Sequence, residues 1–195
     1  MSIETFGDLR GWFRERLETA LGRRQLQAGE GTRAYLVDLL ARVGLGQEND
    51  ALSRPLALQL AEARAAERAE RVRLYRALGD DALYLRGFCT DHLDHRGITT
   101  EYVSTLGETA YGQAGDLTLG SASEIYRELA RKFEAFADAL DDVREGTALR
   151  TPSDIVRLYD KWTRTHSPKI AERLTAEGVF PSAFPSPLRA RGTVH

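Results

Sequence analysis

Apolar residues recur every three or four positions along most of this chain, and no segment alternates apolar with polar residues. A repeat of three or four residues matches the α-helix, whereas strict alternation would indicate a β-strand. The clearest repeat spans residues 121–145 and consists of Ile125, Leu129, Phe133, Phe136, Leu140 and Val143. The pattern predicts an all-α protein, built as a single-domain bundle of seven or eight helices.

Proline, glycine and capping residues divide this pattern into separate predicted helices. No proline occurs between Leu56 and Thr151, and this permits long continuous helices. Ser121 with Glu124 fits a capping box that would open the sixth helix. The predicted helices span about 6–24, 32–43, 55–78, 80–97, 99–115, 121–145, 151–166 and 168–178. The first of them carries an apolar stripe of Leu9, Trp12, Phe13, Leu17, Ala20 and Leu21.

The amino-acid composition of the chain changes after Gly178. Residues 1–178 are predicted to form the helical domain, and residues 179–195 a Phe/Pro-containing extended tail with three prolines and no acidic residue. Such a tail either lies on its own domain, which is the favoured interpretation, or is a short motif that a protein partner binds. In the second case the contacts would come from Phe180, Phe184, Arg189 and Arg191.

Small residues indicate where helices could approach one another closely. Ala57, Ala61, Ala65 and Ala69 recur every four residues in the predicted third helix. We expect another helix of the same chain to cover this alanine strip, with a second subunit as the alternative. Gly107, Gly112 and Gly115 follow a helical pattern and also favour close helix packing.

Length, charge and cysteine content exclude several classes of protein. The chain has 195 residues, a formal charge of −2 and a pI near 6.1, which disfavours a nucleic-acid partner because such binders usually carry a basic surplus. The single cysteine rules out an intrachain disulfide. The amino terminus does not resemble a secretory signal, and no apolar run approaches a membrane span of about 20 residues. We therefore expect a cytoplasmic protein without a membrane partner.

The segment from Cys89 to His95 concentrates the side chains that could bind a metal, in the order Cys89, His92 and His95. A thiolate and an imidazole spaced three residues apart on a helix could share a zinc ion. A closed structural site needs a fourth ligand, and the chain has no second Cys/His pair to supply one. The favoured interpretation is therefore a small buried cysteine and a hydrogen-bonded core histidine, without a cofactor.

Aromatic residues near this segment suggest a second kind of site. Tyr84, Phe88, Tyr102 and Tyr111, together with His92, could line a pocket for a flat apolar ligand. The alternative, an ordinary aromatic core, is favoured. The chain contains no nucleophile elbow, phosphate-binding loop or dinucleotide fingerprint. The sequence thus favours a protein that is not an enzyme.

Four segments, at residues 34–40, 78–88, 110–112 and 154–162, together resemble a group of uncharacterised helical proteins from GC-rich bacteria. The resemblance implies a single helical domain and carries no activity with it.

From the sequence we predict a non-enzymatic interaction or regulatory protein. It would be an oligomeric adaptor that acts through helix faces and the C-terminal tail, with a protein partner or self-association. The alternative is a small-molecule or metal-binding helical protein with a pocket around Phe88, Cys89, His92 and Tyr111.

Overall fold

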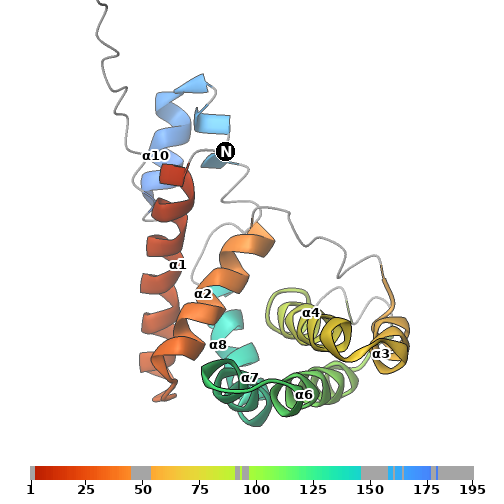
Figure 1. Cartoon of the computed structure of the whole chain (residues 1–195). Helices are drawn as coiled ribbons and strands as arrows, with labels where there is room; N and C mark the ends of the chain where they lie inside the picture. Colours follow the sequence, from red (N-terminus) through yellow and green to blue (C-terminus); the bar gives the residue numbers. More distant parts are fainter. Residues whose placement is uncertain are drawn as a thin grey trace, which may run out of the picture.

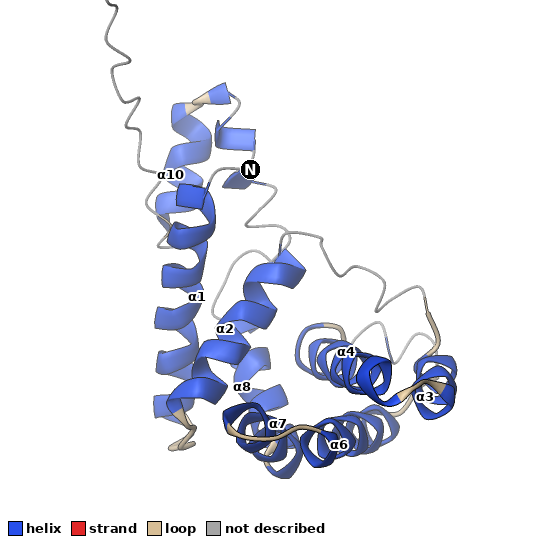
Figure 2. Ribbon diagram, viewed as in Figure 1, coloured by secondary structure: helices blue, strands red, loops and turns tan. Residues whose placement is uncertain are grey.

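A computed structural model describes residues 3–44, 54–90, 93, 97–145, 158–159, 161–163, 165–176 and 179. Among these residues helices are joined by short loops and there is no strand, which confirms the predicted all-α fold (Figure 2). The helices are α1 (Ile3–Arg23), α2 (Glu30–Gly44), α3 (Leu56–Ala65), α4 (Arg68–Phe88), α6 (Thr100–Leu117), α7 (Ser121–Arg131), α8 (Phe133–Glu145) and α10 (Pro168–Ala176).

The first two helices form an antiparallel pair, which we call the N-terminal hairpin (residues 3–44). Arg10 of α1 pairs with Asp38 of α2, and Glu18 of α1 pairs with Arg33 of α2. The helices α3, α4, α6, α7 and α8 make up the helical base. Within the base, α4 lies against α3, α6 and α8. The hairpin rests on α7 and α8 (Figure 1).

A continuous apolar core joins the hairpin to the base. The predicted stripe of α1 is confirmed, because every one of its six members is buried. In α7 and α8 the repeating apolar side chains are also buried, apart from Ile125, which is partly buried against the core. Burial of these stripes is the main favourable contribution to such a fold.

Two glycines allow helices of the base to come unusually close. A Cβ placed on Gly107 of α6 would lie 2.3 Å from the ring of Phe133 in α8. A Cβ on Gly87 of α4 would lie 2.7 Å from the Cβ of Leu140 and 3.1 Å from the carbonyl oxygen of Ala137. The expectation of close packing is confirmed at Gly107 and Gly115, whereas a Cβ on Gly112 would meet no described atom within 4 Å.

The boundary between the third and fourth predicted helices was wrong. The chain leaves the helix at Ala66 and Glu67, which have extended backbone angles. The next helix, α4, then passes through Gly79 and Asp80 without interruption. The break lets α3 fold back against α4, and this packing overrides the good helix propensity of the local sequence.

Helix starts also differ from the predictions at two places. Gly120, with φ +69°, is the N-cap of α7 and no side chain caps the helix, so the Ser121 capping box is wrong. The predicted sixth helix is divided at Lys132, which ends α7 and precedes α8. The fifth predicted helix begins with a cap at Thr99 or Thr100, and the structure confirms Thr99, since its hydroxyl accepts a hydrogen bond of 3.2 Å from the backbone N–H of Tyr102.

The alanine strip does not pack against another helix of the described chain. All four alanines are exposed, and Ala69 lies beyond the break, in α4. The expectation of an internal partner for this strip is therefore wrong.

At the carboxyl end, Pro168 is the first residue of α10, as predicted. The predicted start of the seventh helix at residues 151–154 and the tail beyond Val179 lie outside the described residues. The division into a domain of residues 1–178 and a tail stays a prediction. No helix in the described parts of the chain combines the length and the apolar character needed to cross a membrane.

Candidate functional site

The most unusual side chain in the described structure is Asp80, a carboxylate that is only 2% exposed. It lies in α4, where the neighbouring residues Gly79, Leu83 and Tyr84 are also buried. Removing a carboxylate from water costs several kcal/mol unless partners replace the lost hydration. The surroundings of Asp80 supply such partners from three helices.

Four side chains converge on the Asp80 carboxylate, and we call them with Asp80 the Asp80 cluster. The hydroxyls of Tyr35 in α2 and Tyr111 in α6 both donate to Oδ1, at 2.6 and 2.7 Å. The guanidinium of Arg42 in α2 donates to Oδ2 at 3.1 Å. Nε of Arg76, one turn before Asp80, lies 3.8 Å from Oδ2. Each carboxylate oxygen thus accepts at least one hydrogen bond, which replaces part of the hydration lost on burial.

Aromatic rings enclose the cluster on the side of α6 and α7. The rings of Tyr111 and Tyr126 are nearly parallel, with centroids 6.3 Å apart. Tyr35 meets both of them edge-on. A Cβ on Gly79 would lie 2.7 Å from the Tyr111 ring, so the glycine before Asp80 makes room for this tyrosine.

Burial and the nearby negative charge of Asp80 raise the pKa of Tyr35 and of Tyr111 well above the ordinary value of 10. Both hydroxyls therefore remain protonated donors at neutral pH. A buried carboxylate that accepts three hydrogen bonds from two other helices is suited to hold these helices together.

A second carboxylate, Glu128 of α7, binds the start of α2. Its Oε2 accepts the backbone N–H of Gly29 at 3.0 Å and the hydroxyl of Thr32 at 2.5 Å. Its Oε1 pairs with Lys132 at 2.7 Å, and Lys132 also donates to the carbonyl oxygen of Gln27. Burial raises the pKa of Glu128, but these hydrogen bonds outweigh burial and lower it overall. Thr32, at the start of the second predicted helix, lies within the first turn of α2.

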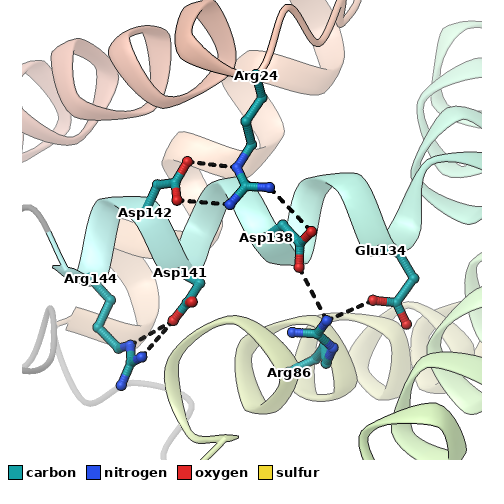
Figure 3. A network of polar contacts seen from close by, with 7 residues as sticks. All are labelled: Arg24, Arg86, Glu134, Asp138, Asp141, Asp142 and Arg144. Carbon is teal, nitrogen blue, oxygen red and sulfur yellow. Dashed lines mark hydrogen bonds and ion pairs between the residues drawn. The ribbon is translucent and has the colours of Figure 1, made fainter.

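Acidic residues of α8 form a third polar network (Figure 3). Arg24, just after α1, binds Asp142 through two bonds of 2.6 and 2.8 Å and Asp138 through one of 3.1 Å. The other oxygen of Asp138 accepts from Arg86 of α4 at 3.1 Å, and Arg86 also pairs with Glu134. The hydrogen bond from Arg24 lowers the pKa of Asp142. This network joins the hairpin, α8 and α4.

The structure describes four of the five residues predicted to line a ligand pocket. Tyr84 and Phe88 are buried and stacked, with ring centroids 5.5 Å apart. Tyr111 is fully buried in the Asp80 cluster, and Tyr102 is 45% exposed at the start of α6. His92 lies outside the described residues, so the pocket stays a prediction.

The predicted metal site is described only at Cys89, which is half-buried just after α4. His92 and His95 lie outside the described residues. Among the residues that the structure does describe, no group of three or more His, Cys, Asp and Glu side chains is arranged to hold a metal. The predicted partner-binding residues Phe180, Phe184, Arg189 and Arg191 are likewise outside the described part.

Depressions lined by described residues lie along the hairpin. One of them is open, has a volume of about 550 Å³ and is lined by Glu18, Leu21, Gly22, Gln25, Leu26, Gln27, Ala28 and Arg33. A neighbouring one of about 210 Å³ shares Glu18 and Arg33 with it. A small one of about 130 Å³ lies where α1 meets α8.

Sequence reasoning missed Asp80, Tyr35 and Glu128 as organising residues. The fourth predicted helix begins at Asp80 or Asp81, because glycine and aspartate often mark helix ends, and this prediction placed Asp80 outside any buried face. One signal was available, namely an acidic residue one helical turn before the apolar residues Leu83 and Tyr84. Such a residue on a buried face requires hydrogen-bonding partners.

No protein-family model, curated protein or solved structure matches this chain, so the resemblance noted from the sequence stays a prediction.

Proposed function

We propose that the protein is a non-enzymatic interaction or regulatory protein, an oligomeric adaptor that works through an exposed helix face. One observation carries this proposal, the outward face of α3. Leu58 is 57% exposed, and the neighbouring Ala57, Ala61 and Ala65 are exposed as well. Contiguous apolar surface of this kind is characteristic of sites where proteins associate.

The simplest partner for this face is a second copy of the chain. In an antiparallel pair centred on Ala61, Ala57 of one copy would lie opposite Ala65 of the other. Small side chains at this spacing let two helices approach closely. The helix has ten residues and is about 15 Å long, so it offers less than the roughly 800 Å² per partner of a stable interface. The association is accordingly weak and depends on concentration.

The proposed setting is cytoplasmic, where a lone cysteine stays reduced. The C-terminal tail remains part of the proposal as a second contact. Its support is its composition alone, since residues 180–195 lie outside the described structure.

Sedimentation velocity over a range of concentrations tests the proposal. We expect the wild-type protein to shift toward dimer as its concentration rises. Ala61→Glu should abolish the shift, because it brings two carboxylates together at the centre of the pair. Ala176→Glu is the matched control, an exposed alanine at the end of α10 that should leave the shift unchanged.

A wild-type protein that stays monomeric at every concentration would contradict self-association through α3. Equal loss in both variants would show that added negative charge, and not the α3 face, prevents association. Deletion of residues 180–195 separates the contribution of the tail, which the α3 proposal expects to be additional.

A further inference from the structure

Most of the polar contacts that cross the seam between the N-terminal hairpin and the base are of one kind, besides the bond from Lys132 to the carbonyl oxygen of Gln27. Carboxylates of the base accept hydrogen bonds from donors of the hairpin at three places along it. Asp80 accepts from Tyr35 and Arg42, Glu128 from Gly29 and Thr32, and Asp138 and Asp142 from Arg24.

The seam reaches solvent where α1 meets α8. An open depression of about 130 Å³ lies there, lined by Arg16, Thr19, Ala20, Arg23, Asp142 and Val143. The side chains of Arg24 and Asp142, which pair beside it, are 35% and 24% exposed.

The hairpin also has contacts that do not depend on the base. The ion pairs Arg10–Asp38 and Arg33–Glu18 connect α1 with α2 directly. If the seam opened, these contacts would keep α1 beside α2, while the two helices, no longer packed on the base, would fray and exchange their amide hydrogens.

We propose that the N-terminal hairpin opens from the base as a unit, and that the Asp80 cluster controls this opening. Proteins open locally in cooperative units that often coincide with supersecondary motifs, and a helical hairpin is such a motif. Two of the four partners of Asp80, Tyr35 and Arg42, leave with the hairpin. The other two, Tyr111 and Arg76, stay in the base. A partner that recognises the uncovered apolar faces would bind only the open form and would shift the population toward it.

Tyr35 and Tyr111 provide a matched pair of variants to test this opening. Both hydroxyls donate to the same oxygen of Asp80. Opening breaks only the bond from Tyr35, because Tyr111 stays with Asp80 in the base. Tyr35→Phe therefore destabilises only the closed form. The free energies of opening and of global unfolding both decrease. Tyr111→Phe destabilises the closed and the open form together, so the opening equilibrium changes little.

Native-state hydrogen exchange of the full chain, followed by mass spectrometry at low denaturant concentrations, measures the opening of the hairpin and the unfolding of the whole protein separately. We expect Tyr35→Phe to speed exchange about tenfold in α1, α2, α4 and α6, as for the loss of a hydrogen bond to a buried charge. Tyr111→Phe should speed exchange in α4 and α6 by about the same factor. In that variant, exchange in α1 and α2 should stay within about twofold of wild type.

Two results would overturn the proposal. If Tyr111→Phe speeds exchange in α1 and α2 as much as in α4 and α6, the protein opens as one unit and the hairpin is not separate. If α1 and α2 exchange through different openings in the wild-type protein, the hairpin does not move as a unit. Arg24→Gln adds an independent check, because it weakens the seam at α8 and should speed exchange in α1 and α2 with Asp80 intact.

Discussion

The helices within the base and the hairpin on top of it are held by different kinds of contact. In the base, glycines let helix backbones and large side chains approach so closely that Gly87 and Gly107 have no space for a methyl group. Beneath the hairpin, carboxylates at Asp80, Glu128 and Asp142 accept hydrogen bonds across the seam. Both regions share one apolar core, so the difference lies in what fixes the position of each element.

The two kinds of contact respond to different conditions. Close packing of apolar groups does not titrate and is lost only when the helices separate. Contacts with carboxylates depend on pH, on salt where they are exposed, and on the presence of every partner. One chain therefore combines a base fixed largely by close packing with a hairpin whose attachment depends on carboxylates.

The largest effect on stability is expected at Asp80, which accepts hydrogen bonds from both the hairpin and the base. Asp80→Ala should lower the free energy of unfolding by about 3–5 kcal/mol, because Arg42 and two buried hydroxyls lose their acceptor. Urea denaturation measures the change. Asp116→Ala, which removes an exposed carboxylate paired with Arg127, is the control and should stay within about 0.5 kcal/mol of wild type. A cost below about 1 kcal/mol for Asp80→Ala would show that the cluster adds little to stability.

Two glycines of α6 test whether close helix packing stabilises the base. Gly107→Ala should destabilise the protein by about 1–3 kcal/mol, because the new methyl group overlaps the Phe133 ring. Gly112→Ala makes the same chemical change where nothing lies within 4 Å, and it should stabilise by up to about 1 kcal/mol through helix propensity. Thermal or urea unfolding compares them. Equal effects of the two substitutions would contradict the importance of close approach at Gly107.

Acid should detach the hairpin before it unfolds the base. The pKa values of Asp142 and Glu128 are lowered in the folded protein, so their contribution is present above their ordinary values of 3.8 and 4.5. It is lost as the pH falls below these values and through the lowered ones. In a Trp162→Phe background, the fluorescence of Trp12 reports on α1, and circular dichroism reports on all helices. We expect the fluorescence transition at the higher pH, whereas coincident transitions would show that hairpin and base respond as one.

The smallest effect on the free energy of unfolding is expected for a substitution on the outer face of α3. Leu58→Ala should change the free energy of unfolding by no more than about 0.5 kcal/mol, because this side chain is exposed. Leu56, two residues earlier, is 8% exposed, and Leu56→Ala should cost about 2 kcal/mol or more. If Leu58→Ala costs as much, its side chain has a partner within the monomer and the α3 proposal loses its support.

The sequence predicted the helices wherever apolar periodicity and capping residues agree. The stripe of α1 and the Thr99 cap are examples, because each depends on neighbours within a few residues. The break at Ala66 and Glu67 could not be predicted, since both residues are good helix formers. Only the packing of α3 against α4 ends the helix there.

The Asp80 cluster was beyond prediction for a related reason. Its members come from positions 35, 42, 76, 80 and 111, and nothing in their spacing indicates that they meet. The predicted pocket shared Tyr111 with this cluster but assigned it to different neighbours. Partners that are distant in sequence become visible only when the helices are placed.

The glycine at position 107 also fixes how the helices of the base are aligned along their axes. Residues one turn away on the same face of α6 are Val103 and Tyr111, and both carry side chains that are buried. A slip of α6 by one turn in either direction would put one of these side chains where the Phe133 ring now lies. The missing side chain thus selects a single register among those that the apolar stripes alone would permit, and this keeps Tyr111 level with Asp80.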